Sequence, residues 1–160
     1  MSGMAASPGV APFLRFGGSP SEKVVVAVLG VNGRGVVHAQ NFARLPNSEV
    51  AYICDVDANV VSKGVNAVTK APGAKTPRVV SDFRRILDDP SVDALAMATP
   101  DHWHCLPTIA AIEAGADVYV QKPISVDVVE GQAMVAAARK YGRVVQVGTQ
   151  RRSTAHIIEA

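Results

Sequence analysis

Short apolar segments alternate with longer amphipathic segments along most of the chain, and this alternation constrains the fold more than any other feature. Segments typical of buried parallel strands occupy residues 23–30, 49–54, 78–80, 92–98, 117–120 and 144–147. Helices are predicted over residues 35–45, 57–69, 82–87, 102–114 and 126–141, and another from Thr149 onward. Because crossovers between parallel strands are right-handed, helices must cover both faces of the sheet. We therefore expect an α/β fold, a Rossmann-type doubly wound parallel sheet of six strands in the order 3-2-1-4-5-6.

Composition supports one ordered domain. The 160 residues are 48% hydrophobic and 19% charged, which is too apolar for a disordered chain and enough for a sizeable core. With 16 Lys and Arg against 14 Asp and Glu, and no run of like charge, nucleic-acid binding has no electrostatic support. Cys54 and Cys105 make neither a disulfide framework nor a metal site, so we expect buried free thiols. No apolar stretch is long enough for a membrane span.

The first residues differ in composition from the rest. Gly, Pro and Ser supply 11 of residues 1–21, which predicts a flexible lead-in before a domain at 22–160. This lead-in lacks the basic and apolar regions of a secretory signal. A cytoplasmic location follows from the sequence as written, and a periplasmic one would follow if a twin-arginine signal preceded it.

A glycine-rich turn follows the first predicted strand and is the first chemical signal. In a dinucleotide-binding turn, glycines allow a tight bend, close approach of backbone N–H groups to a pyrophosphate, and close helix packing. The match to G-x-G-x-x-G is imperfect, because Asn32 takes the middle glycine's place, beside Gly33. Asn tolerates a left-handed φ better than most residues. The candidate cofactor-binding residues here are Gly30, Asn32, Gly33, Arg34 and Gly35.

Asp55 is the second signal, because it ends the second predicted strand 20 residues after Gly35. A carboxylate at this place accepts hydrogen bonds from the adenosine ribose hydroxyls. No Lys or Arg follows at positions 56 and 57 to receive a 2′-phosphate. The sequence therefore predicts NAD rather than NADP as the cofactor. Asp57 is the better candidate for an ordinary loop acid or a helix cap.

Three polar loops follow the fourth, fifth and sixth predicted strands, at the edge where such sheets bind ligands. They are 99–104 (TPDHWH), 121–123 (QKP) and 148–153 (GTQRRS). Turn and capping chemistry is the simpler alternative for each, with Asp101 as a helix cap and Ser81 as the cap of the short helix before them. A metal site among Asp101, His102, His104 and Cys105 is disfavoured, because these side chains diverge at a helix start.

Taken together, the segments GVNGRG (30–35), CDVD (54–57), ATPDHWH (98–104), QKP (121–123) and GTQRRS (148–153) resemble the glucose–fructose oxidoreductase / inositol dehydrogenase / MocA family. The resemblance covers residues 23–160. It implies an N-terminal NAD-binding Rossmann domain, and a C-terminal α/β substrate domain that this chain does not contain. The chain is thus expected to be the cofactor half of a homo-oligomeric enzyme acting on a carbohydrate-like small molecule.

The resemblance also implies roles for single residues. Lys122 matches the lysine of the family's Glu-Lys-Pro motif and would be the catalytic residue, followed by a proline that is commonly cis, here Pro123; Gln121 replaces the usual glutamate. The other matching residues would line the cofactor or lie near it: Thr99, Pro100, Asp101, His104, Gln150 and Arg151.

Three functions remain open from the sequence. The first is hydride transfer between nicotinamide and a sugar, polyol or related hydroxyl compound. The second is a glycosidase or lyase of the same family that uses NAD transiently, and the third is a non-catalytic dinucleotide-binding module. Net reduction of the cofactor would separate the first function from the second.

Overall fold

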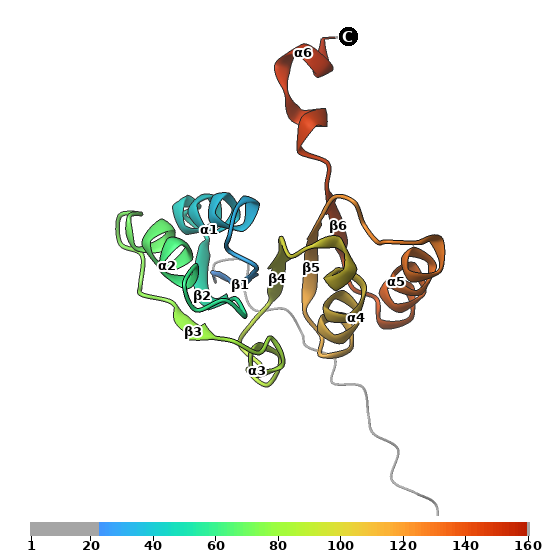
Figure 1. The fold of residues 1–160 in the computed structure, drawn as a ribbon, viewed down its shortest axis with the longest axis horizontal. Coiled ribbons are helices and arrows are strands. Elements are labelled where there is room, and N and C mark those ends of the chain that lie inside the picture. Colours follow the sequence, from blue (N-terminus) through green and yellow to red (C-terminus); the bar gives the residue numbers. More distant parts are fainter. Residues whose placement is uncertain (1–22, 160) are drawn as a thin grey trace, which may run out of the picture.

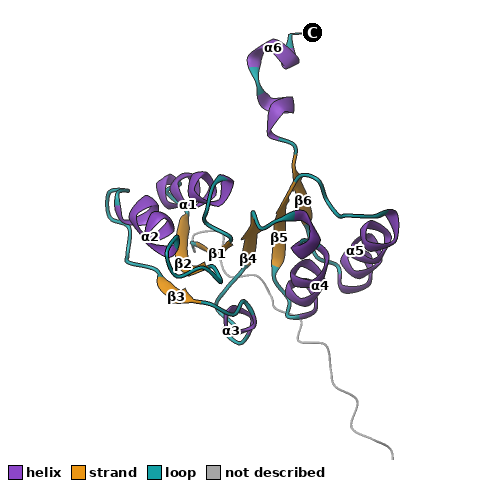
Figure 2. Ribbon diagram, in the orientation of Figure 1, coloured by secondary structure: helices purple, strands orange, loops and turns teal. Residues whose placement is uncertain are grey.

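The computed structural model describes residues 23–159, so the lead-in expected at 1–21 lies outside the described residues. Six parallel strands form one sheet in the order β3-β2-β1-β4-β5-β6, which confirms the predicted order (Figures 1 and 2). The strands are β1 (Val24–Leu29), β2 (Ser48–Cys54), β3 (Arg78–Val80), β4 (Ala94–Met97), β5 (Asp117–Gln121) and β6 (Val145–Gly148). The order reverses between β1 and β4, where a parallel sheet opens a crevice for ligands.

Helices cover both faces of the sheet. α1 (Arg34–Arg44) and α2 (Val61–Thr69) pack on one face, and α3 (Arg84–Leu87), α4 (Cys105–Glu113) and α5 (Val128–Tyr141) on the other (Figure 1). Two short 3₁₀ turns, Asp101–Trp103 and Gln150–Ser153, follow β4 and β6. After β6 the chain projects away from the sheet and ends in α6 (Ala155–Ile158) (Figure 1).

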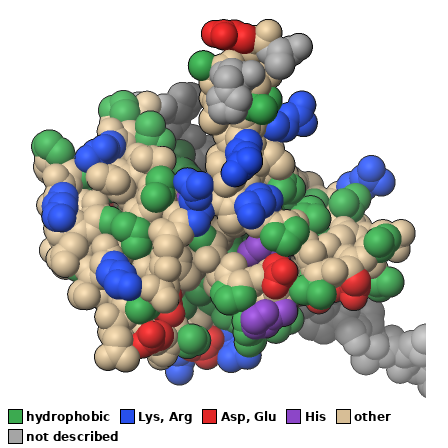
Figure 3. All heavy atoms as spheres, turned by 45° about the horizontal axis from the view of Figure 1, so that its top comes forward, with side chains coloured by type: hydrophobic (Ala, Val, Ile, Leu, Met, Phe, Trp, Pro, Cys, Tyr) green, Lys and Arg blue, Asp and Glu red, His purple; other side chains and the backbone are tan. Residues whose placement is uncertain are grey.

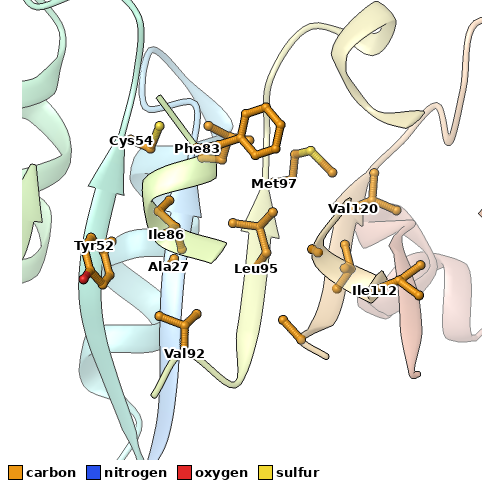
Figure 4. Close-up of a cluster of buried hydrophobic side chains, with 14 of the residues drawn as sticks. Ala27, Tyr52, Cys54, Phe83, Ile86, Val92, Leu95, Met97, Ile112 and Val120 are labelled. Atoms are coloured by element: carbon orange, nitrogen blue, oxygen red, sulfur yellow. The ribbon is translucent and has the colours of Figure 1, made fainter. Parts of the chain in front are cut away.

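Successive side chains of the central strands point to opposite faces of the sheet, and they form one apolar layer on each face. On β1, Val26 and Val28 face α1 and α2, whereas Ala27 and Leu29 face the opposite layer. Figure 4 shows that opposite layer, in which Phe83 and Ile86 lie between β2 and β4, close to Leu95. These layers anchor the strands and so fix the positions of the loops at their carboxyl ends.

Helices α2 to α6 each begin two to six residues later than the sequence predicts. Short polar turns explain the delay of α2, α4 and α5. Asp57 accepts a hydrogen bond from the N–H of Asn59 at 2.9 Å, and the turn it forms delays α2 until Val61. The 3₁₀ turn Asp101–Trp103 similarly precedes α4. Before α5, Asp127 accepts from the N–H of Glu130 at 2.9 Å and acts as the N-cap, so the helix begins at Val128.

Three smaller expectations need correction. Asp82, not Ser81, accepts the hydrogen bond from the N–H of Arg84 at 3.0 Å and therefore stabilises the start of α3. The Cys54 thiol is buried as expected, but Cys105 is only partly buried. Asn32 does not use a left-handed φ, because within the described residues only glycines have positive φ.

Candidate functional site

The turn between β1 and α1 requires glycine at both of its ends. Gly30 has a φ of +83°, and a Cβ there would lie 2.9 Å from backbone atoms of Ala98 and Thr99. A Cβ on Gly35 would overlap the carbonyl oxygen of Gly30. The turn therefore tightens at Gly30, while Gly35 lets α1 pack directly against it, as the sequence predicts.

The same turn presents unused hydrogen-bond donors. Within residues 23–159, no protein acceptor binds the backbone N–H groups of Asn32, Gly33 and Arg34. They lie at the start of α1, whose first turn has no acidic residue and no side-chain cap. At Gly33 no atom lies within 4 Å of the position that a Cβ would take. Free donors, an uncapped helix start and open space are the features that suit a pyrophosphate group.

Asn32 occupies the place of the motif's middle glycine without blocking the turn. Its side-chain oxygen accepts a hydrogen bond from Nζ of Lys63, on α2, at 2.7 Å. This pairing brings a cation next to the free N–H groups of the turn. The sequence analysis missed Lys63, because nothing in the spacing of the two residues predicts which faces of α1 and α2 meet.

Asp55 is braced by the backbone on either side of it. One carboxylate oxygen accepts from the N–H of Val31 at 2.8 Å, and the other accepts from the N–H of Asp57 at 3.0 Å. Each oxygen retains a further lone pair, and the residue lines a pocket next to the turn. Asp55 is therefore held in a fixed orientation from which it can accept hydrogen bonds from a ligand.

A pocket of about 810 Å³ opens at the carboxyl ends of β1 to β4, a volume typical of small-molecule sites. Seven of the predicted cofactor residues line it: Gly30, Asn32, Gly33, Arg34, Asp55, Thr99 and Pro100. The structure adds lining residues that the sequence analysis did not select for the site, among them Asp82, Phe83 and Arg84 after β3, and it places Trp103 there with an exposed side chain.

The charges in this pocket are largely internally balanced. The Arg84 guanidinium lies 3.0 Å from an Asp82 carboxylate oxygen and 5.5 Å from the centre of the Phe83 ring. The hydrogen bond from the Arg84 backbone, together with the Arg84 side chain, lowers the pKa of Asp82. Burial, with Asp55 and Asp82 nearby, raises the pKa of the Cys54 thiol to about 12. The pocket therefore favours an ionised Asp82 carboxylate and a neutral Cys54 thiol, which excludes Cys54 as a nucleophile.

Seven predicted residues lie outside the lining of this pocket. Gly35 is at the start of α1, Asp101 and His104 follow β4, and the other four follow β5 and β6, namely Lys122, Pro123, Gln150 and Arg151. The peptide bond between Lys122 and Pro123 is cis, as the resemblance implied. His104 is 1% exposed, and its ring nitrogens lie 2.6 Å from the carbonyl oxygen of Pro123 and 3.0 Å from that of Thr99. His104 therefore joins the loops after β4 and β5.

Asp101, Gln150 and Arg151 differ in their surroundings. Asp101 and Arg151 are exposed, and Asp101 accepts a hydrogen bond from the N–H of His102 at 2.9 Å. Gln150 is partly buried, and with its amide nitrogen toward Gly148 its oxygen accepts from Arg34 at 3.2 Å. Figure 3 turns this edge of the sheet toward the reader, and Lys and Arg side chains gather around the base of the projecting C-terminal segment. Such a basic edge favours an anionic ligand.

Two further properties bear on the kind of protein. Among residues 23–159, no group of three or more His, Cys, Asp or Glu side chains could hold a metal ion. In that same part of the chain, no helix combines the length and apolarity needed to cross a membrane.

The fold, the open glycine turn and the braced carboxylate define a dinucleotide-binding domain. The model of the Gfo/Idh/MocA family, described as "Oxidoreductase family, NAD-binding Rossmann fold", matches residues 24–149. The chain belongs to this family, and the described residues form its NAD-binding Rossmann domain.

Known relatives place the domain within longer proteins. The uncharacterized oxidoreductase YrbE of Bacillus subtilis is 29% identical over 136 residues, which cover 85% of this chain and 38% of YrbE. A glycosyl hydrolase family 109 protein of Saccharopolyspora erythraea is 32% identical over 125 residues, covering 76% of this chain and 27% of that protein. The chain thus spans between a quarter and two fifths of the length of these relatives.

Solved structures agree with the fold. The crystal structure of GenD2 from gentamicin A biosynthesis in complex with NAD has a TM-score of 0.78 and 25% identity, covering 94% of this chain and 40% of GenD2. The crystal structure of myo-inositol 2-dehydrogenase from Lactobacillus plantarum has a TM-score of 0.73, covering 84% of this chain and 38% of that chain; its 23% identity supports the fold alone.

Proposed function

We propose that this domain binds NAD across the carboxyl edge of its sheet and serves as the cofactor half of an oxidoreductase. The adenosine half would occupy the 810 Å³ pocket, and the nicotinamide would lie toward β5 and β6. The observation that carries the proposal is the set of free N–H groups at Asn32, Gly33 and Arg34, next to the braced Asp55. Asp101, His104, Gln150 and Arg151 stay predicted cofactor neighbours.

The charges lining the pocket favour NAD over NADP. Asp55 would accept hydrogen bonds from the ribose hydroxyls and would repel a 2′-phosphate. Arg84 also lines the pocket, but its guanidinium is paired with Asp82. Asp82 therefore offsets the positive charge of Arg84 at that place.

We propose that Lys122 is the catalytic residue. Bound NAD would supply the hydride acceptor or donor, and Lys122 would hold or move the proton at the reacting oxygen of the substrate. Its side chain is exposed, and within residues 23–159 its Nζ forms no hydrogen bond or ion pair. Such a lysine is free to contact a substrate. We expect that substrate to be a sugar, polyol or related hydroxyl compound, bound by a second α/β domain outside this chain.

A second candidate function comes from the names of the relatives. Several matching proteins are described as glycosyl hydrolase family 109 proteins, and one from Shewanella oneidensis, 29% identical over 123 residues, as an alpha-N-acetylgalactosaminidase. A transient oxidation by bound NAD would serve such a reaction, and turnover without net NADH would identify it. A non-catalytic dinucleotide-binding module stays a third alternative. The homo-oligomeric state and the cytoplasmic or periplasmic location also stay predictions.

The test of this proposal uses a longer chain in which this domain is joined to a substrate domain. Lys122→Ala should lower the rate of hydride transfer by about 10²–10⁴, the usual scale for a general acid or base, with NAD affinity little changed. Single-turnover nicotinamide absorbance measures that rate. If Lys122 only positions the substrate, the loss appears in KM rather than in kcat.

The matched control is Lys70→Ala, which removes an exposed lysine at the end of α2. It should leave both constants unchanged. A Lys122→Ala variant with the original rate and the original KM would remove Lys122 from the site.

A further inference from the structure

The Gln121 side chain is buried at the carboxyl end of β5, directly before Lys122. It is 7% exposed, and its Oε1 accepts a hydrogen bond from the backbone N–H of Lys122 at 2.8 Å. Its Nε2 lies 3.3 Å from Nε2 of His38, which is 8% exposed on α1. One amide group therefore links the backbone of Lys122 to the helix that begins at the glycine turn.

The chemistry of the two nitrogens determines the protonation of His38. An amide NH₂ group can only donate, so Nε2 of His38 must accept, and its ring proton must be on Nδ1. Burial and the nearby positive charge of Arg34 lower the pKa of His38 to about 4, so the ring is neutral near pH 7. A neutral acceptor is therefore available to Gln121 under ordinary conditions.

Gln150 and two packed neighbours complete the surroundings of the amide. With its amide nitrogen toward Gly148, Gln150 donates to Oε1 of Gln121 at 3.0 Å. The Tyr119 ring packs edge-on against His38, with 5.1 Å between ring centres. A Cβ on Gly148 would lie 2.9 Å from the Tyr119 hydroxyl and 3.1 Å from Oε1 of Gln121, so a side chain at position 148 would crowd this amide. Gln121 is consequently held from several sides.

We infer that Gln121 is a positioning residue, whose amide fixes the backbone of Lys122 relative to α1 by using neutral His38 as its acceptor. The role in catalysis rests on the function proposed for Lys122, whereas the hydrogen bonds themselves do not. A glutamate at position 121 could still accept from the N–H of Lys122. It could not donate to His38, so it would favour a protonated imidazole as its partner.

This difference gives an experiment on the 160-residue chain that needs no cofactor. In ¹⁵N NMR spectra, His38 should show the neutral form with its proton on Nδ1. Gln121→Glu should raise the measured pKa of His38 by at least about one unit, the effect of an opposite charge within hydrogen-bond distance. Hydrogen exchange at the Lys122 N–H should stay slow in Gln121→Glu and become at least about tenfold faster in Gln121→Leu, which lacks the acceptor.

Two further variants serve as controls. Gln146→Leu removes an exposed glutamine from the neighbouring strand β6 and should change neither measurement. His38→Gln supplies an amide oxygen in place of Nε2 and should keep exchange at Lys122 slow, even if Gln121→Leu does not fold. A His38 ring protonated on Nε2, or unchanged Lys122 exchange in folded Gln121→Leu, would overturn the inference.

NAD titration of the same samples separates this inference from the proposed function. Absence of NAD binding with the predicted His38 tautomer would refute the cofactor role alone. Normal NAD binding with the wrong tautomer would refute the role of Gln121 alone.

Discussion

Both carboxylate oxygens of Asp55 accept backbone N–H groups, so this side chain is fixed before any ligand arrives. We predict that Asp55→Ala lowers NAD affinity by at least about tenfold, which corresponds to roughly 1.4 kcal/mol. The variant loses the acceptor for the ribose hydroxyls and also the hydrogen bond from the N–H of Val31. Isothermal titration calorimetry measures the change, and a thermal melt checks that the domain stays folded.

The matched control for Asp55 is Asp88→Ala. Asp88 is exposed after α3 and lies outside the pocket, where it contacts Arg85 at 3.9 Å. It should leave NAD affinity unchanged. Unchanged affinity in Asp55→Ala as well would exclude the ribose contact.

Gly35 is required for packing rather than for ligand binding, because there is no space for a side chain at this position. We predict that Gly35→Ala lowers the free energy of unfolding by about 3 kcal/mol or more, since its Cβ would overlap the Gly30 carbonyl. Urea denaturation measures the loss. Gly131→Ala, on α5, is the control: its Cβ would meet only the hydroxyl of Ser125, and alanine favours helix, so its stability should equal or exceed that of the original chain. Equal stability of the two variants would contradict the packing described for the turn.

The sequence predicts residues whose roles depend on their own loop, and fails where two elements must first be packed together. Gly30, Gly35 and Asp55 follow from the strand–turn–helix pattern, and the structure brings them to one place. The contact of Lys63 with Asn32 requires knowing how α1 and α2 meet. The link from Gln121 to His38 joins residues 83 positions apart, on different elements, and has no local signal.

At the scale of elements, Met134 is the main core contact of α5, beside partly buried Ala137 and Ala138. Met134 is 1% exposed and is the one fully buried residue of this 14-residue helix. We predict that Met134→Ala lowers the free energy of unfolding by about 2–5 kcal/mol, the cost of a cavity in a packed core. Val129→Ala, on the same helix but 72% exposed, should cost less than about 0.5 kcal/mol. Chemical denaturation compares the two, and similar losses would contradict the assigned orientation of α5.

The strands were easier to predict than the helix starts. Buried parallel strands have continuous apolar sequences, so β1 and β2 begin within one residue of the prediction. Helix starts depend on which polar side chain captures a backbone N–H. Asp57 and Asp82 are the first residues of their predicted helices, and each binds the N–H of the residue two positions further on. A periodicity of apolar residues does not report such local competition.

At the scale of the whole molecule, the sheet order divides the carboxyl edge into two parts. Strands β1 to β4 end around the pocket with Asp55, and β5 and β6 end beside Lys122 and Gln150. An extended dinucleotide laid across the point of reversal would reach from one part to the other. The order of the strands thus explains why the predicted binding residues come from five separate loops.

The central claim is that this edge binds NAD in preference to NADP, and calorimetric titration of the 160-residue chain with each cofactor tests it most directly. The account predicts that NAD binds at least about tenfold more tightly than NADP, because Asp55 repels a 2′-phosphate and Arg84 is already paired. Equal affinities, or tighter binding of NADP, would contradict it.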